Sequence, residues 1–367
     1  MSIGEIRDKF IGFLYRNLLK PILFLQDPEK VHDRTIIAGR VLGSNSATRG
    51  LTGMMFGYQN PMLSQNIAGL NFKNPVGLAA GFDKEGYLLA LLPSVGFGFE
   101  EVGSITALPF DGNERPWMWR LPEAKALRIN YGLKNSGAVN IHQRLKNRKF
   151  GFVLGVSLAK TNSEKTSHVQ TGIEDYFESY KIFQDVGDYF TINISCPNTC
   201  EVSPIFAQAE NLDLLLAKLF SIPKTKPVFI KLSPDLADDQ LHQILQVGQK
   251  HPVDGFICTN LTKTNIFNHK GKGGFSGKAV EELSNQLIAK VYKFYGGKKI
   301  VIGCGGVFSA QDAYKKIKLG ASLVQLITGM IFQGPQLIGE INRGLTKCLK
   351  QDGYKNISEA VGENLQS

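Results

Sequence analysis

Residues 188–199 read DYFTINISCPNT, an apolar and β-branched run that ends in a cluster of amides, hydroxyls and a thiol. A continuous apolar run of this length is typical of a strand buried on both faces, as the strands of a parallel sheet are. Polar side chains that directly follow such a strand gather at the carboxyl edge of the sheet. The stretch therefore predicts a buried parallel strand with a candidate site at its end.

The same pattern occurs eight times along the chain, with helical segments between most of the runs. The runs are NPVGLAAG (74–81), GFEEVGSIT (98–106), FVLGVSLA (152–159), DYFTINIS (188–195), PVFIKLSP (227–234), DGFICTN (254–260), KIVIGCGG (299–306) and ASLVQLIT (321–328). Helices are predicted in the spacers at 174–186, 236–250, 279–295 and 309–319. Eight strand–helix units indicate a TIM (β/α)8 barrel of the α/β class. A doubly wound open sheet is the alternative, but no GxGxxG follows the first strand.

Composition and charge limit the classes of partner. The chain has 367 residues with 43% hydrophobic content, which excludes a disordered protein. The formal net charge of +10 fits an anionic ligand, a nucleic acid or an anionic membrane face. Without an Arg-rich tail or zinc-finger spacing, nucleic acid is not expected. The six histidines form no HxxxH pair, so no metal site is predicted.

The five cysteines point to reduced thiols. Their number is odd, and Cys258 and Cys304 stand inside strand-like runs, as expected for a cytosolic setting. Cys196 and Cys200 have the spacing of a CxxxC redox pair, and Cys196 alone also fits a small buried core residue. The residues alone leave these alternatives open.

The N-terminal region is predicted to be helical and separate from the barrel. A first helix is expected at about 4–19, and Asp27-Pro28-Glu29 is a typical start for a second. The small polar stretch GSNSATRG at 43–50 then reads as a linker, which divides the chain into a helical region, 1–45, and a barrel domain, 46–367. No signal peptide or membrane-spanning run is evident.

The strand ends carry the predicted chemistry. They hold amides, hydroxyls and lysines, with neither the paired carboxylates of a glycosidase nor the ligand set of a metal hydrolase. Lys231 and Asn193 stand inside buried runs, where each needs a polar partner. Glycines at 273–277, 303–306 and 328–330 suit backbone binding of phosphate. This combination favours a flavin together with a small carboxylate substrate.

At these strand ends the chain resembles the dihydroorotate dehydrogenase family, flavin enzymes of pyrimidine synthesis, from about residue 20 to residue 345. The matching blocks are NPVGLAAGFDKEG, GFGFEEVGS, NISCPNT, KLSPDL, GGFSG, IGCGG and GASLVQLITGMIFQGP. QDPEKVH (26–32) and WRLP (119–122) resemble the membrane-associated, quinone-linked class. The resemblance implies FMN-dependent oxidation of dihydroorotate to orotate with electrons passed to a quinone, by a peripheral protein on the cytoplasmic side of a membrane.

The resemblance also implies roles for individual residues. Cys196 matches the general base and Arg120 the residue between quinone and flavin. The positions matching FMN contacts are Ala80, Lys84, Ser104, Ser157, Asn193, Lys231, Thr259, Gly277, Gly305, Gly306, Thr328 and Gly329. The positions matching substrate contacts are Lys84, Asn130, Leu133, Asn193, Asn198 and Asn260.

Several positions depart from the family pattern, mainly on the substrate side. Cys196 replaces the Ser of the quinone-linked class, Ser157 replaces an Asn, and Leu261 replaces a Thr or Ser. In RINYGLKN (128–135), Ile129 falls where a substrate-holding Asn is expected unless a one-residue gap gives that place to Asn130. Leu133 replaces a Phe, and the lid after Thr199 reads CEVSPIF. Two alternatives therefore stand: a related FMN enzyme with another small cyclic substrate, or a barrel that binds a phosphorylated ligand without catalysis.

Overall fold

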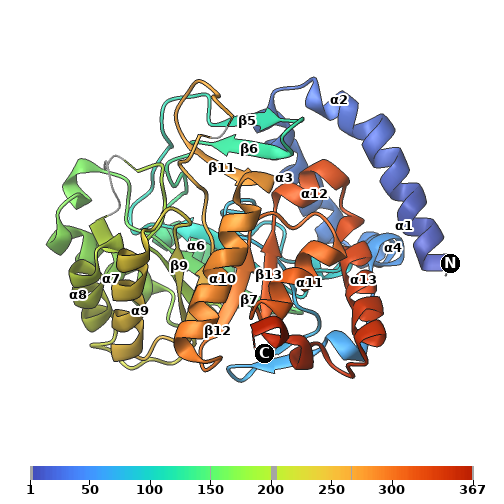
Figure 1. Ribbon diagram of the computed structural model, residues 1–367. Helices are drawn as coiled ribbons and strands as arrows, with labels where there is room; N and C mark the ends of the chain where they lie inside the picture. The colour runs from blue at the N-terminus through green and yellow to red at the C-terminus, as the bar shows by residue number, and fades with distance from the viewer. Residues whose placement is uncertain (1–2, 149, 200–204, 266, 366–367) are drawn as a thin grey trace.

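The computed structural model describes residues 3–148, 150–199, 205–265 and 267–365, and its centre is a closed barrel of eight parallel strands (Figure 1). All eight predicted strands are present, and each pairs with the next in sequence, while the last closes on the first. The predicted TIM barrel is therefore confirmed. The barrel strands are β3 (Val76–Leu78), β4 (Phe99–Ile105), β7 (Val153–Leu158), β8 (Tyr189–Asn193), β9 (Val228–Leu232), β10 (Gly255–Cys258), β12 (Ile300–Cys304) and β13 (Leu323–Leu326).

Helices surround the barrel and cover the outer faces of its strands (Figure 1). They are α5 (Leu92–Val95), α6 (Ala138–Leu145), α7 (Val169–Ile182), α8 (Ala209–Leu219), α9 (Asp238–Lys250), α10 (Glu281–Tyr295), α11 (Ala310–Lys318), α12 (Thr328–Gln333) and α13 (Leu337–Asp352). The helices predicted in four spacers correspond to α7, α9, α10 and α11. The first lies about four residues earlier than predicted.

The amino-terminal end of the barrel is closed by an aromatic layer. A hairpin of β1 (Gln65–Ile67) and β2 (Leu70–Phe72) brings the Phe72 ring edge-on to Phe99, with ring centroids 5.4 Å apart. Phe99 fills the space beside Gly77, where a Cβ would lie 2.3 Å from the ring. Because this end is filled by apolar side chains, the polar groups of the barrel interior face the opposite, carboxyl end.

The N-terminal region is helical, as predicted, but its first helix is not uniform. It consists of α1 (Ile3–Leu14), a π-helical segment (Tyr15–Leu19) and α2 (Lys20–Phe24). The second helix, α3 (Pro28–Ser44), begins where predicted, since the Asp27 side chain accepts hydrogen bonds from the backbone N–H groups of Glu29 and Lys30. These bonds satisfy two donors that the first turn leaves without a partner.

The predicted linker at 43–50 is wrong. Its residues belong to α3 and to a further helix, α4 (Ser46–Phe56), separated only by Asn45. Asn45 has an extended backbone, and its side chain accepts a hydrogen bond from Ala47 N. The small residues instead serve packing: a Cβ on Gly43 would lie 3.3 Å from Leu91. The small residues of this stretch, which we interpreted as a linker, instead allow the helices to pack closely.

The N-terminal helices contact the barrel through polar groups and expose apolar ones. Asp8 of α1 is buried and its carboxylate lies 3.1 Å from the guanidinium of Arg343 on α13. The buried Glu29 accepts a 2.6 Å hydrogen bond from Trp117 N. The outward side chains of these helices include Ile3, Ile6, Phe10, Phe13, Leu18, Leu19, Ile22, Leu25, Ile37, Val41, Leu51 and Met54. Among the described residues, no helix combines the length and apolarity needed to cross a bilayer.

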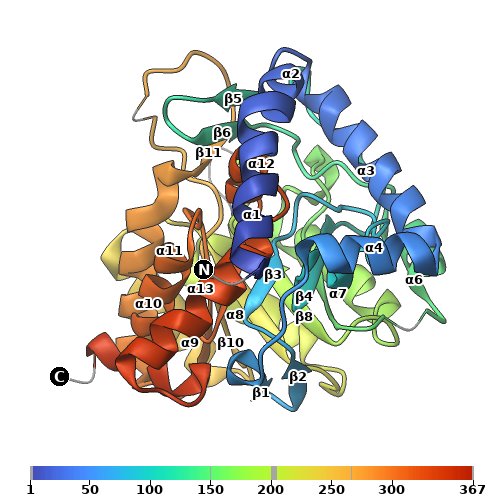
Figure 2. The same ribbon diagram turned by 90° about the vertical axis from the view of Figure 1, so that its right-hand side faces the viewer.

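A small antiparallel sheet lies over the carboxyl end of the barrel. Its strands are β5 (Met118–Leu121), β6 (Ala126–Ile129) and β11 (Gly274–Gly277), in the order β11-β6-β5. Figures 1 and 2 both show this sheet above the barrel and next to α2. The sequence analysis did not predict it. Together with α12, the sheet encloses the space at the strand ends.

Candidate active site

A cavity lies at the carboxyl ends of the barrel strands. Its walls come from the carboxyl ends of β3, β4, β8, β9, β10, β12 and β13 or the segments that follow them, and from the upper sheet. All but three of the residues that we predicted for a site line this cavity. They are Ala80, Lys84, Ser104, Leu133, Asn193, Cys196, Asn198, Lys231, Thr259, Asn260, Gly277, Gly305, Gly306, Thr328 and Gly329.

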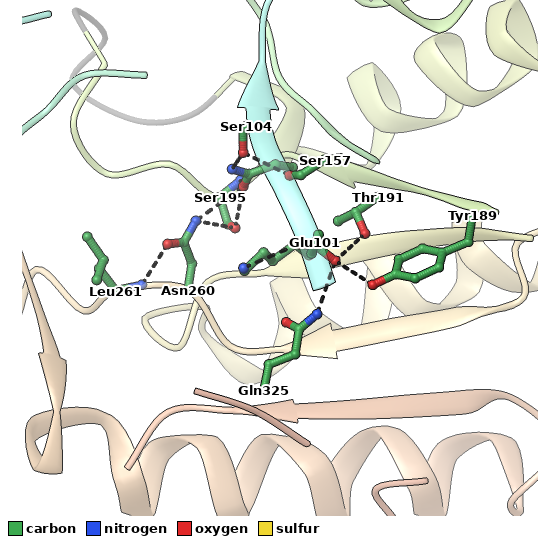
Figure 3. A network of polar contacts seen from close by, with 11 residues as sticks. Glu101, Ser104, Ser157, Tyr189, Thr191, Ser195, Asn260, Leu261 and Gln325 are labelled. Atoms are coloured by element: carbon green, nitrogen blue, oxygen red, sulfur yellow. Dashed lines mark hydrogen bonds and ion pairs between the residues drawn. The ribbon is translucent and has the colours of Figure 1, made fainter. Parts of the chain in front are cut away.

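A hydrogen-bond network fixes the amide of Asn193 at the end of β8 (Figure 3). Its Nδ2 donates to Ser104 Oγ at 2.8 Å, and that oxygen lies 2.8 Å from Ser157 Oγ. Its Oδ1 accepts from Ser195 Oγ at 3.1 Å and from Asn260 Nδ2 at 3.2 Å. The network orients the Asn193 amide before any ligand binds. Ser157 lies behind Ser104 rather than in the cavity wall.

A buried charged layer lies inside the barrel below this network (Figure 3). Lys231 Nζ is 3.7 Å from Glu101 Oε1. The other carboxylate oxygen of Glu101 accepts hydrogen bonds from Thr191 Oγ1 at 2.8 Å, Gln325 Nε2 at 3.2 Å and Tyr189 OH at 3.3 Å. Because Glu101 compensates its charge, Lys231 can present an ammonium to the cavity from a buried strand.

Lys84 is a second cation of the cavity wall. Burial lowers the pKa of its ammonium to about 8; the charge of Asp33 opposes this shift and that of Lys134 adds to it. Its Nζ lies 3.7 Å from the centre of the Tyr131 ring. An aromatic face partly replaces the water that a buried ammonium loses. Lys84 therefore remains cationic at neutral pH and faces a ligand-sized space.

Cys196 and Asn198 form the side of the cavity that follows β8. Burial raises the pKa of the Cys196 thiol to about 11. The Oδ1 of Asn198 is buried without a hydrogen-bond partner among the described residues. A buried acceptor without a partner costs free energy unless a ligand N–H reaches it. This part of the cavity therefore offers both a proton acceptor, once deprotonated, and a free amide oxygen. Cys200, the other half of the CxxxC pair, lies outside the described residues, as do residues 201–204 of the lid.

Glycines line the opposite end of the cavity. Gly305 and Gly306 have φ of +115° and +74°, which side-chain-bearing residues rarely adopt. A Cβ on Gly306 would lie 2.3 Å from Glu281, and one on Gly277 would lie 2.8 Å from Thr328. The backbone is thus exposed to a ligand at a position where barrels commonly bind phosphate.

Arg120 is not part of the cavity wall. Its guanidinium lies 4.7 Å from the Phe24 ring and donates to the carbonyl oxygens of Leu23 and Gln26, at 3.1 and 2.8 Å. It therefore caps the end of α2 and joins that helix to β5. The predicted quinone residue thus lies at the junction between the N-terminal helices and the sheet that covers the cavity.

The third residue outside the wall is Asn130, whose amide belongs to a second network. Asn113 Nδ2 donates to Asn130 Oδ1 at 3.2 Å and to the backbone oxygen of Asn198 at 2.9 Å, while Asn113 Oδ1 accepts from Asn162 Nδ2 at 3.1 Å. Ile129, not Asn130, lines the cavity. Asn113 therefore connects three segments around the turn that carries Cys196.

Sequence reasoning missed several residues of the wall. Those with polar or aromatic side chains are His32, Phe82, Tyr131, Lys134, Ser276 and Cys304. Tyr131 and Lys134 belong to the block RINYGLKN and His32 to QDPEKVH, so their motifs were identified without a role for these side chains. The described residues contain no group of three His, Cys, Asp or Glu side chains able to hold a metal ion.

Comparison with known proteins agrees with this geometry. A family model described as dihydroorotate dehydrogenase matches residues 62–349. The chain belongs to the dihydroorotate dehydrogenase family. It is 38% identical to the dihydroorotate dehydrogenase (quinone) of Nautilia profundicola, over 94% of this chain and 96% of that protein. It is 35% identical to the dihydroorotate dehydrogenase (quinone) of Trichodesmium erythraeum, over 95% of this chain and 98% of that protein.

A solved dihydroorotate dehydrogenase has the same fold. The crystal structure of the Eimeria tenella DHODH in complex with ferulenol superposes with a TM-score of 0.82 at 29% identity, covering 93% of this chain and 96% of that one. Dihydroorotate dehydrogenases are flavoenzymes. The cavity suits a flavin because an exposed glycine backbone lies at one end, and the ordered Asn193 amide and two lysines lie at the other. The alternative of a non-catalytic barrel is therefore set aside.

Proposed function

We propose that this chain uses FMN to oxidise dihydroorotate to orotate and passes the electrons to a quinone at the membrane surface. The observation that carries the proposal is the cavity itself, in which Cys196, three asparagines and cations occur together at the strand ends. Neutral amides orient a cyclic diamide, and cations attract its carboxylate. The two quinone-linked relatives support the choice of electron acceptor.

The cofactor proposed is FMN, with its phosphate at Gly305, Gly306 and the start of α12. A mononucleotide fits because α12 begins at Thr328 in the cavity wall, where backbone N–H groups are free to bind an anion. The residues proposed to contact FMN are Ala80, Lys84, Ser104, Ser157, Asn193, Lys231, Thr259, Gly277, Gly305, Gly306, Thr328 and Gly329, with Ser157 acting through Ser104. When bound, the flavin supplies the hydride acceptor.

The chain's own contribution to the chemistry is orientation and proton transfer. The Asn193, Asn198 and Asn260 amides hold the substrate ring by its N–H and carbonyl groups. Cys196, as thiolate, takes the proton from C5 while the hydride leaves C6. Lys84 binds the substrate anion, and Lys231 keeps a positive charge beside the flavin. Leu133 closes the apolar side of the substrate space.

The N-terminal region, residues 1–45, is proposed to lie on the cytoplasmic face of a membrane and to admit quinone. Ile6, Phe10 and Phe13 follow one another at helical spacing on α1, and each is more than half exposed. An amphipathic helix of this type can bury its apolar face in a lipid interface without crossing it. α4 also exposes Leu51 and Met54. Arg120 at the end of α2 is proposed to contact the quinone at the entrance.

Anaerobic reduction of the purified protein tests the proposal. Bound FMN gives a yellow protein, dihydroorotate bleaches it, and a short-chain quinone restores the oxidised spectrum. A colourless protein that does not bind added FMN contradicts the cofactor. A yellow protein that dihydroorotate does not bleach at any pH contradicts the substrate.

A second candidate keeps the flavin and changes the substrate. Ile129 and Leu261, both apolar, line the substrate end of the cavity where the family pattern has polar residues. This candidate predicts that orotate leaves the flavin spectrum unchanged and that another dihydropyrimidine or cyclic enone turns over instead.

A further inference from the structure

Lys84, Lys134 and Lys231 are the lysines of the cavity wall, and they differ in how their charges are compensated. Lys231 has the buried carboxylate of Glu101 at 3.7 Å. Within the described part of the chain, no carboxylate forms an ion pair with Lys84 or Lys134. Asp33, Asp83 and Glu85 act on Lys84 only from beyond ion-pair distance, so these two cations can still attract an anion.

Two neighbouring aromatic rings, tilted by 37° to one another, contact these cations. The Trp117 and Tyr131 rings have centroids 5.1 Å apart. Lys134 Nζ lies 4.3 Å from the centre of the Trp117 ring, and Lys84 Nζ lies 3.7 Å from that of Tyr131. A cation–π contact attracts an ammonium without neutralising it. The rings therefore position both ammonium groups and leave their charges for a ligand.

The position of Lys134 explains how the free protein tolerates the second charge. Lys134 is half-buried and also lines a neighbouring cavity between α3 and the segment 110–136. His32, Phe82, Lys84 and Tyr131 belong to the walls of both cavities. The Lys134 ammonium lies against Trp117, a wall residue of the second cavity, and can be hydrated from that side, while the residue also borders the first cavity.

Lys134 belongs to the block RINYGLKN (128–135), and neither Ile129 nor Asn130 of that block offers a free amide to the substrate. Ile129 lines the cavity with an apolar side chain, and Asn130 is buried with its Oδ1 bound to Asn113. In contrast, Lys134, five residues after Ile129, faces the cavity.

We propose that Lys134 is a substrate-binding residue that binds the carboxylate of dihydroorotate and orotate together with Lys84. The inference rests on the proposed function. It makes the carboxylate the main determinant of specificity in this chain, because two ammonium groups compensate for the apolar side chains of Ile129 and Leu261. A pyrimidine without a carboxylate gains nothing from either lysine.

Paired ligands test this role in the holoenzyme. Orotate and uracil differ by the carboxylate, and each is titrated against the flavin absorbance of the wild type, Lys134→Gln and Lys134→Arg. Lys350→Gln, an exposed lysine on α13, is the matched control. Loss of a charged hydrogen bond is expected to raise the Kd of orotate in Lys134→Gln by about 10- to 100-fold. Uracil binding stays unchanged, and Lys134→Arg recovers most of the orotate affinity.

The quinone half-reaction separates this role from a structural one. Reoxidation of the reduced flavin by quinone is expected to proceed at the wild-type rate in Lys134→Gln, with full FMN content. An orotate Kd within twofold of the wild type overturns the inference, and so does an equal loss of orotate and uracil binding. If Lys134→Gln does not fold, Lys134→Met repeats the test with a chain of similar length. If the wild type itself binds no orotate, the proposed function fails instead.

Discussion

The ammonium of Lys231 lies 3.7 Å from the Oε1 carboxylate oxygen of Glu101, and both side chains are buried inside the barrel. The pair lies above the aromatic layer and below the cavity. A barrel interior of this kind is usually filled by branched apolar side chains. Here one layer holds a charge pair, because the site above it needs a cation at the end of β9.

Glu101→Gln is expected to destabilise the fold. The change preserves volume but leaves the buried Lys231 without a counterion, and breaking a buried pair typically costs about 3–5 kcal/mol. Urea unfolding followed by circular dichroism measures the loss. Glu123→Gln, an exposed carboxylate, is the control and should change stability by less than about 0.5 kcal/mol. Equal unfolding midpoints for the two variants would show that Glu101 does not compensate Lys231.

The raised pKa of Cys196, about 11, predicts a rising pH profile for flavin reduction. Only the thiolate accepts the C5 proton, so at saturating dihydroorotate the rate constant should rise about tenfold per pH unit from pH 7 to 9. Anaerobic stopped-flow absorbance measures it. Cys196→Ala should lose about 10²- to 10⁴-fold at pH 8. Cys196→Ser, whose hydroxyl is less acidic than the thiol, should reduce the flavin more slowly than the wild type at each pH. A flat profile in the wild type contradicts Cys196 as the base.

The lowered pKa of Lys84 predicts the opposite trend for binding. Below a pKa of about 8 the side chain is an ammonium, and above it the charge is lost. Orotate affinity should therefore be constant at pH 6–7 and weaken as the pH rises through 8. Titration of the holoenzyme with orotate, followed by flavin absorbance, measures this. Lys84→Arg keeps its charge, so its affinity should not fall over the same range. An unchanged wild-type affinity from pH 6 to 10 rules out this titration.

The barrel could be predicted from sequence because each of its strands is identified by a pattern within the strand itself. Each buried parallel strand is a continuous apolar run, and the residues after it, such as Asn193 and Thr259, necessarily share the carboxyl end. By contrast, the upper sheet pairs β6 with β11, which lie about 145 residues apart, and short strands of this kind carry no distinct pattern.

The sequence also could not predict which side chains point toward the ligand. The sequence could not decide whether Ile129 or Asn130 faces the ligand, since a one-residue change of register reverses the two faces of a strand. Lys134 was missed because a lysine after a glycine turn is usually a surface residue. Its role became visible only from the position of the Trp117 ring and the two cavities.

Asn113→Asp should impair the substrate half-reaction alone. Aspartate keeps the acceptor for Asn162 but loses the donor to Asn198 O, and its charge repels that carbonyl. The turn that carries Cys196 should then be less well placed, with flavin reduction by dihydroorotate at least tenfold slower and quinone reoxidation unchanged. Rapid-mixing experiments measure the two half-reactions separately. Equal slowing of both would indicate a general loss of structure instead.

The exposed face of α1 provides the test of membrane contact. Phe10 and Phe13 are 61% and 57% exposed, while the inward face of the helix buries Asp8 and Gly12. Replacing both phenylalanines with serine should leave the packing against the barrel intact and remove most of the apolar area available to lipid. Each phenylalanine contributes roughly 2 kcal/mol when fully buried, so the double variant should bind liposomes at least tenfold more weakly. Vesicle co-sedimentation measures the loss.

The control for that experiment uses equally exposed apolar residues on other helices. Val139 of α6 and Leu214 of α8 are 53% and 55% exposed and belong to helices outside the N-terminal region. The Val139→Ser/Leu214→Ser variant should bind vesicles as the wild type does. Reduction of quinone held in the vesicles should fall only in the Phe10→Ser/Phe13→Ser variant, while flavin reduction by dihydroorotate stays the same in both. If both double variants lose vesicle binding equally, the protein adsorbs to lipid through any exposed apolar residue. The α1 face would then not be a specific membrane contact.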